Sequence, residues 1–161
     1  MTLRRAATGD EPFLRRLYAE LRAPEFAALG LDPAALDALL AMQHQAQDRA
    51  HRARHPGADI DLVVLDGRPA GRLVVDRTAA AIHVVDITLA REDRGGGVGT
   101  VLLQHVIDEG RRSGRPVTLQ VLRVNPAVRL YRRLGFAVCG EDEVHLMMEC
   151  PSRATQLNTA W

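Results

Sequence analysis

The sequence predicts one α+β domain with mixed α/β layers, in which a central mixed sheet of about seven strands is combined with about four helices. A chain of 161 residues suits a single domain, and 47% hydrophobic with 25% charged residues is ordinary for a globular protein. Apolar runs typical of strands and the 3.6-residue periodicity typical of helices both occur. They do not alternate strictly along the chain, which argues against a (β/α)8 barrel.

The first expected elements are a short strand over residues 3–7 and a helix that follows it. Thr8 and Glu11 have the spacing of a capping box, and Asp10 is an alternative N-cap. The apolar positions that share one face of this helix are Leu14, Leu17, Tyr18 and Leu21.

A second helix is expected from Asp32-Pro33, because aspartate caps helices and proline suits the first turn. It ends near the breaker cluster His55-Pro56-Gly57. His44, His51 and His55 lie in its polar later part, and the last two form an i, i+4 pair that could bind a metal. No HExxH pattern accompanies them, so a solvated helix face is the favoured interpretation.

Residues 60–89, which follow the second helix, are expected to form strands. Ile60–Leu65 and Pro69–Val75 flank Asp66-Gly67, a strong signal for a two-residue hairpin turn. Ile82–Leu89 is a further run rich in β-branched residues.

The last part of the chain combines two helices and three strands. After the glycines of residues 95–99, one helix face is expected to carry Val98, Val101, Leu102, His105 and Val106. Asn125-Pro126 is expected to open the other helix, whose face carries Leu130, Tyr131 and Leu134 and which stops at Gly135. The strand candidates are Val117–Val121, Phe136–Cys139 and Val144–Cys150.

These elements place a single domain over residues 1–150, followed by a polar C-terminal tail over 151–161. No run approaches the roughly 18 apolar residues of a membrane span, and the N-terminus shows no apolar signal region. Two cysteines, Cys139 and Cys150, do not make a disulfide framework. We therefore expect a cytoplasmic protein without a membrane partner.

The charges exclude several classes of function. The 21 basic and 20 acidic residues leave a net charge of +1, so no nucleic-acid partner is expected. All basic residues are arginine. Without lysine the chain can neither contain a Walker phosphate loop nor form a lysine Schiff base.

The most informative segment is the glycine-rich stretch Arg94-Gly95-Gly96-Gly97-Val98-Gly99-Thr100 between an expected strand and an expected helix. Glycines let the backbone turn tightly, and their N–H groups together with a helix N-terminus attract phosphate oxygens. Arg94 adds a guanidinium fork. The segment therefore predicts a pyrophosphate site, with a plain glycine turn as the alternative. A dinucleotide fingerprint is disfavoured, because Thr100 stands at its third glycine position.

Two motifs carry a family resemblance. Arg94, Gly97 and Gly99 fill the pattern R-x-x-G-x-G, and residues 125–136 fill every fixed position of N-x-A-x-x-L-Y-x-x-x-G-F. In this order they resemble the GNAT superfamily of acyl-CoA N-acyltransferases. The resemblance is specific over about residues 82–139. It implies the GNAT fold and direct transfer of the acetyl group of acetyl-CoA to an amine, without an acyl-enzyme intermediate and without a metal.

The resemblance also implies which residues bind the co-substrate. The backbone N–H groups of Gly95, Gly96, Gly97, Val98, Gly99 and Thr100 would hold the CoA pyrophosphate, and the guanidinium of Arg94 could pair with its phosphates. The N–H of Leu89 would polarise the acetyl carbonyl. Asn125 would bond the pantetheine arm or orient the helix that follows it.

Three residues are candidates for catalysis. Tyr131 matches the family tyrosine that protonates the departing thiolate, although its periodicity also suits a core residue. Several family members have a basic glutamate eleven positions before the motif arginine, where this chain has His83. Histidine is a suitable base at neutral pH. Asp86 lies on the opposite face of a regular strand and could serve only if a bulge resets the alternation. A structural role is the alternative for both.

The acceptor is the least determined part. The resemblance implies that the first two helices and the last hairpin recognise a small-molecule or peptide amine. Glu141-Asp142-Glu143 would attract a cationic amine there, or form a plain solvated turn. The alternative function is an acyl-CoA-binding regulatory domain of the same fold without transfer activity. Small family members often pair through exposed strands or helices, so a homodimer is compatible with the resemblance.

Overall fold

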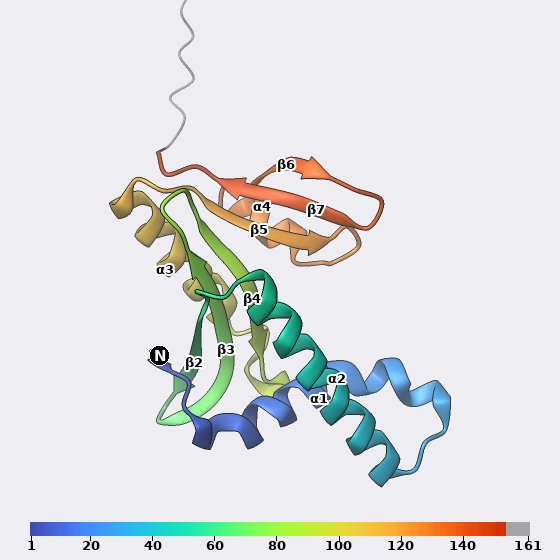
Figure 1. Ribbon diagram of the computed structural model, residues 1–161. Coiled ribbons are helices and arrows are strands. Elements are labelled where there is room, and N and C mark those ends of the chain that lie inside the picture. Colours follow the sequence, from blue (N-terminus) through green and yellow to red (C-terminus); the bar gives the residue numbers. More distant parts are fainter. Residues whose placement is uncertain (154–161) are drawn as a thin grey trace, which may run out of the picture. The chain divides into compact units, whose positions relative to one another are not determined.

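The computed structural model describes residues 1–153 (Figure 1). Within this range it contains seven strands and four α-helices, in the order β-α-α-β-β-β-α-β-α-β-β that the sequence predicts. The strands are β1 (Thr2–Arg5), β2 (Asp59–Leu65), β3 (Arg68–Arg77), β4 (Ile82–Leu89), β5 (Val117–Leu122), β6 (Ala137–Glu141) and β7 (His145–Cys150). The helices are α1 (Glu11–Phe26), α2 (Pro33–Arg54), α3 (Val98–Ser113) and α4 (Val128–Arg133).

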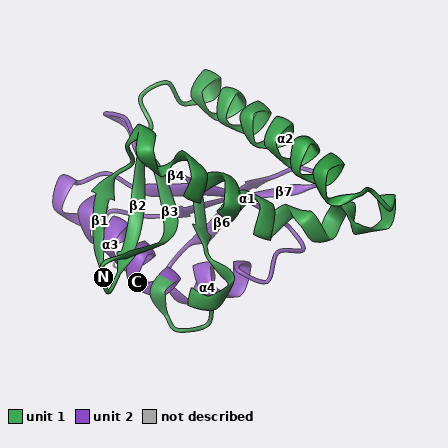
Figure 2. Ribbon diagram, turned by 90° about the horizontal axis from the view of Figure 1, so that it is seen from below, with its two compact units in different colours: residues 1–75, 86–98 green, residues 76–85, 99–161 purple. Residues whose placement is uncertain are grey.

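The strands form one mixed sheet in the order β1-β2-β3-β4-β5-β7-β6, which confirms the predicted fold class. The chain divides into two compact units (Figure 2). The first contains Met1–Val75 and Asp86–Val98, and the second contains Asp76–Val85 and, within the described residues, 99–153. The interpretation of residues 1–150 as one domain stays a prediction, and residues 154–161 of the predicted tail lie outside the described range.

In the first unit, β1, β2 and β3 form an antiparallel meander. The predicted hairpin turn is confirmed: Asp66 and Gly67 have φ values of 47° and 80°, as a type I′ turn requires. The register between β2 and β3 shifts between Val63 and Val64, which marks a β-bulge.

The two N-terminal helices lie side by side in this unit (Figure 1). The predicted capping box of Thr8 and Glu11 is wrong, because a 3-10 turn, Thr8–Asp10, precedes α1. Asp10 instead accepts the N–H of Ala7 at 2.8 Å and pairs with Arg4 at 2.7 Å. The cap of α2 is confirmed, since the Asp32 carboxylate accepts the N–H of Ala35 at 2.9 Å.

His44 corrects the expectation of a solvated histidine face on α2. Its side chain is only 1% exposed and lies against the ring of Tyr18, with centroids 5.3 Å apart. Neither ring nitrogen has a hydrogen-bond partner, although Glu11 and Asp48 lie 3.6 and 3.8 Å away. The polar sequence around it conceals this burial, because helix packing and not local hydropathy decides which face is covered.

In the second unit, β7 pairs antiparallel with both β5 and β6, and β4 pairs parallel with β5 over Ile82–Val84. The buried face of α3 is rotated from the predicted one. Val101 is 53% exposed, whereas Leu103 and Ile107 are buried. The helix approaches the sheet at Gly110, where an added Cβ would lie 2.7 Å from a methyl group of Val117. Gly110 therefore lies on the buried face of α3, together with Leu103 and Ile107.

No helix in residues 1–153 is long and apolar enough to cross a membrane.

Candidate active site

The glycine segment forms an exposed loop that leads from β4 into α3. Gly95 and Gly97 have φ values of +79° and +84°, in the left-handed region that favours glycine. A Cβ added at Gly95, Gly96 or Gly97 would meet no atom within 4 Å. A ligand can therefore approach this backbone closely, and the first N–H groups of α3 lie directly after it.

An ion pair ties the start of this loop to the β2–β3 hairpin. Arg68, the first residue of β3, donates two hydrogen bonds to Asp93, at 2.6 and 2.9 Å. These bonds lower the pKa of the Asp93 carboxyl, whose side chain is only 6% exposed. The sequence analysis missed this pair, because no motif joins residues 25 positions apart.

Arg94 contacts Leu89 across the short turn that follows β4. The Nε of Arg94 donates to the carbonyl oxygen of Leu89 at 2.9 Å, so the guanidinium is held beside the last residue of β4. This bond uses Nε, and a guanidinium has four further N–H donors on its Nη groups. Gly71 of β3 passes Leu89 so closely that an added Cβ would lie 2.8 Å from its Cδ2. Gly71 is a second residue that the sequence analysis missed.

Asp86 belongs to a polar network under α2. It accepts from the Nε of Arg72 at 2.7 Å and from the hydroxyl of Thr88 at 3.0 Å. Arg72 also donates to Gln47 at 3.1 Å and lies 3.5 Å from Asp48. Its side chain is only 6% exposed. A further proton on Asp86 would disturb these hydrogen bonds, so the network favours a structural role over a basic one.

His83 lies in the second unit, on the short ladder between β4 and β5. Its Nδ1 is 2.9 Å from the hydroxyl oxygen of Thr118, its register partner on β5. The ring is half-buried.

Asn125 and Tyr131 also lie in the second unit. The side chain of Asn125 accepts the N–H of Ala127 at 2.9 Å and so starts the turn into α4, as predicted. Tyr131 is half-buried and meets the edge of Phe136, with ring centroids 5.9 Å apart. The end of the motif holds Tyr131 and Phe136 close to each other. Gly135 between them has a φ of +98°, and the N–H of Phe136 donates to the carbonyl oxygen of Tyr131 at 3.0 Å.

Two of the acidic side chains in the turn after β6, those of Glu141 and Asp142, bind neighbouring groups of the protein. Asp142 accepts the N–H groups of Val144 and His145 at 2.7 and 2.6 Å, and Glu141 pairs with Arg123 at 3.0 Å. The hydrogen bonds from the backbone of His145 and Val144 lower the pKa of Asp142. This agrees with the plain turn that was the alternative to an acceptor site.

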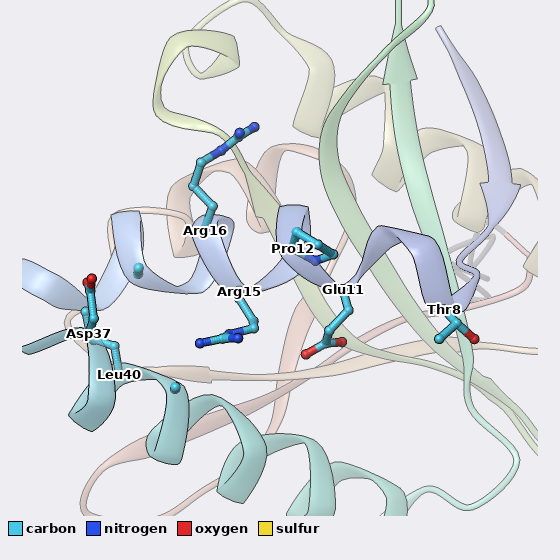
Figure 3. Close-up of a pocket in the computed structure, with 9 residues that line it drawn as sticks. Thr8, Glu11, Pro12, Arg15, Arg16, Asp37 and Leu40 are labelled. Carbon is cyan, nitrogen blue, oxygen red and sulfur yellow. The ribbon is translucent and has the colours of Figure 1, made fainter. Parts of the chain in front are cut away.

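A pocket of about 670 Å³ opens between α1 and α2 in the first unit (Figure 3). Glu11, Arg15 and Asp37 line it with opposite charges, and Leu40 adds an apolar wall. In the described residues, 1–153, no group of three or more His, Cys, Asp or Glu side chains could hold a metal ion.

The predicted residues are thus distributed over both units. Those in the first unit are Asp86, Leu89, Arg94, Gly95, Gly96, Gly97 and Val98. Those in the second are His83, Gly99, Thr100, Asn125 and Tyr131.

The sheet order, the glycine loop and the asparagine-tyrosine segment together define the class of acyltransferases that use an acyl-CoA. The model of the acetyltransferase (GNAT) family matches residues 14–136, so the chain belongs to this family of N-acetyltransferases.

Individual relatives agree with this assignment. The streptothricin acetyltransferase of Streptomyces lavendulae is 42% identical over 81 residues, which cover 48% of this chain and 43% of that enzyme. The structure of a nourseothricin acetyltransferase has a TM-score of 0.53 and 32% identity, and the match covers 61% of this chain and 67% of that one. The PaiA N-acetyltransferase of Thermoplasma acidophilum, in complex with coenzyme A, shares the fold over 93% of this chain and 98% of its own, with a TM-score of 0.70 and 16% identity.

Proposed function

We propose that this chain transfers the acetyl group of acetyl-CoA directly to an amine acceptor. The observation that carries the proposal is the conformation of the loop after Arg94, where Gly95 and Gly97 are both left-handed and α3 begins at Val98. This backbone exposes N–H groups beside a helix N-terminus, which suits the two phosphates of CoA. The nearby guanidinium of Arg94 supplies a positive charge.

The reaction needs few groups. The neutral amine attacks the thioester carbonyl, the N–C bond forms, and the C–S bond then breaks. The N–H of Leu89 would stabilise the negative oxygen that develops during the attack. Tyr131 would give its phenolic proton to the departing thiolate, and Asn125 would bond the pantetheine arm or hold α4.

A base must take the proton that the ammonium group of the acceptor loses. We assign this role to His83 in preference to Asp86. Asp86 is held by Arg72 and Thr88, and a further proton would disturb those hydrogen bonds. The imidazole of His83, whose Nδ1 lies 2.9 Å from the hydroxyl oxygen of Thr118, is of a residue type suited to act as a base at neutral pH.

The acceptor pocket is proposed between α1 and α2. Glu11 and Asp37 can pair with a cationic amine, and Arg15 can pair with an anionic group of the same molecule. Because relatives carry the names streptothricin and nourseothricin acetyltransferase, streptothricin is the first acceptor to test.

The test begins with calorimetric titration by acetyl-CoA, CoA and NADH. We expect micromolar binding of both CoA species and none of NADH. Gly97→Ala should weaken acetyl-CoA binding at least tenfold, because alanine is strained at a φ of +84°. Gly30→Ala is the matched control, since its φ of +61° is also left-handed and its surroundings are open, but it lies outside the glycine loop. No binding of either CoA species would refute the proposal.

Transfer is then measured by release of free thiol with streptothricin and a panel of primary amines. Turnover on any of them supports the enzyme. Tight acetyl-CoA binding with no turnover across the panel would favour the alternative, a regulatory domain that binds acyl-CoA.

A further inference from the structure

A groove of about 770 Å³ lies in the second unit, between α4 and the β6–β7 hairpin. Four segments line it: the loop before α4, α4 itself, β6 and β7. Among the described residues that line it, Asn125 alone belongs to the predicted acetyl-CoA site, and it lies in the loop before α4. The rest of the groove has no part in the proposed transfer reaction.

Part of this groove is apolar. Val124, in the loop before α4, is 89% exposed, which is the largest value for a large apolar side chain in the described part of the chain. Val138 of β6 is 41% exposed, and Leu146 of β7 lines the groove beside it. Exposed apolar side chains that gather inside a polar rim are typical of an interaction site.

The charged residues of the groove are mainly arginines. Arg123 is already engaged, because it pairs with Glu141 at 3.0 Å and donates to the carbonyl oxygen of Asp142 at 2.9 Å. Arg129 and Arg132 are exposed and lie three positions apart on α4, where side chains are neighbours. Neither guanidinium has a hydrogen bond or an ion pair with any residue in the range 1–153. Two neighbouring cations repel each other, so an anion that binds both is favoured.

These features fit a peptide better than a nucleic acid. A guanidinium binds a carboxylate through two parallel hydrogen bonds, and the apolar part suits an aliphatic side chain. An extended acidic peptide presents both groups at successive positions along the groove. No aromatic residue of the described chain lines the groove, so a base would find no ring on which to stack.

We propose that this groove binds an acidic peptide segment of a partner protein. Carboxylates of the segment pair with Arg129 and Arg132, and an aliphatic side chain covers Val124 and Val138. The segment docks and is not acetylated, so the proposal goes beyond acetyl transfer and does not depend on it. No sequence motif indicates the groove, because its lining residues come together only through the packing of α4 on the hairpin.

The first test measures binding of two synthetic peptides to the full-length chain by fluorescence anisotropy. One is Glu-Thr-Val-Thr-Glu-Thr-Val-Thr-Glu, whose glutamates and valines share one face when extended, and the other has Glu and Val in adjacent pairs. Both carry fluorescein on the N-terminus and contain no amine to acetylate. We expect saturable binding of at least one peptide, weakened several-fold between about 50 and about 500 mM NaCl.

The control peptides carry arginine in place of glutamate and should bind roughly tenfold more weakly or worse. If neither acidic peptide bound at up to about 1 mM protein, the proposal would be overturned. Equal binding of the arginine peptides would overturn it as well, because charge complementarity would then have no part in the binding.

Variants of exposed residues locate the binding. Arg129→Gln/Arg132→Gln should weaken it roughly fivefold or more, because two charge pairs are lost. Val124→Ser should weaken it about threefold, because the apolar contact is lost. Arg112→Gln is the matched control, since this exposed arginine lies on α3 in the same unit and does not line the groove. An unchanged affinity in the double variant, or an equal loss in Arg112→Gln, would refute the assignment.

Two further measurements distinguish this peptide from other occupants. Saturating acetyl-CoA should leave the peptide affinity within about twofold, whereas displacement would assign the groove to the co-substrate and contradict the proposal. A dimer in sedimentation that Arg129→Gln/Arg132→Gln converts to a monomer would make a second copy of the chain the occupant, which also contradicts it. Peptide binding without thiol release on any amine contradicts the proposed acetyl transfer and supports the groove.

Discussion

Replacing Arg72 by methionine tests the polar network that joins β3, β4 and α2. The substitution keeps an unbranched apolar stem and removes the charge. It breaks the bond to Asp86 at 2.7 Å, the bond to Gln47 at 3.1 Å and the ion pair with Asp48 at 3.5 Å. The carboxylates of Asp86 and Asp48 then lose the guanidinium that pairs with them, and their side chains are only 20% and 21% exposed, respectively.

The magnitude follows from this burial. Removing one partner of a fully buried ion pair costs about 3–5 kcal/mol of unfolding free energy, whereas an exposed pair contributes about 0–1 kcal/mol. Arg72 is nearly buried and its partners are one-fifth exposed, so we expect a loss of about 2–4 kcal/mol. Water reaching the two carboxylates keeps the value below the upper limit.

The assay is equilibrium unfolding in urea with a double-mutant cycle. Arg72→Met/Asp86→Asn should be less destabilised than the sum of the single variants, with a coupling of about 1–2 kcal/mol. Arg16→Met is the matched control, because that side chain is 68% exposed and should cost less than about 0.5 kcal/mol. A loss below about 0.5 kcal/mol in Arg72→Met would show that the network does not hold α2 on the sheet. Asp86→Asn should also retain most of the acetyl transfer, and a hundredfold drop would return the basic role to Asp86.

Three further predictions concern other parts of the chain. Gly71→Ala should lose about 1–3 kcal/mol in urea unfolding and weaken acetyl-CoA binding in calorimetry, because the new methyl group would overlap the backbone carbonyl oxygen of Thr88 and lie 2.8 Å from Cδ2 of Leu89. Gly9→Ala, whose new methyl group would meet nothing within 4 Å, should change neither quantity. Arg4 and the N–H of Ala7 lower the pKa of Asp10 to about 2, below its ordinary 3.8. Its stabilising effect is therefore complete above about pH 4 and disappears as the pH falls toward 2; Asp10→Asn should flatten that part of the stability profile, and an unchanged slope would contradict the pairing. Tyr131→Phe should lower kcat by about 10²-fold or more and leave acetyl-CoA binding intact, whereas unchanged turnover across pH would remove the acid role.

Much of the fold could be predicted because its signals are local. The Asp66-Gly67 turn, the Asp32 cap and the left-handed Gly135 each depend on a few neighbouring residues, and the structure has all three. Helix faces were predicted less well. Val101 is exposed and His44 is buried, since periodicity defines a stripe on a helix but not the direction from which the sheet covers it.

The candidate site divides in the same way. Its backbone part, from Arg94 to Thr100, could be located from glycine spacing, because positive φ values and a helix start are written into consecutive residues. Its side-chain partners could not. Arg68 binds Asp93 from 25 positions away, and Thr118 meets His83 from 35 positions away.

The order of the strands and helices, the glycine loop and the motifs that mark the family can all be inferred from the amino-acid sequence. These properties arise from residues next to one another, whose backbone preferences act whatever the rest of the chain does. Only the folded chain shows that Arg72 binds Asp86, that Gly71 lies against Leu89 and that Nδ1 of His83 is 2.9 Å from the hydroxyl oxygen of Thr118. Such pairs form only when strand register and packing bring distant segments of the chain together. Burial in these places makes an unpaired charge or an extra methyl group costly, and the local sequence does not show which places are buried.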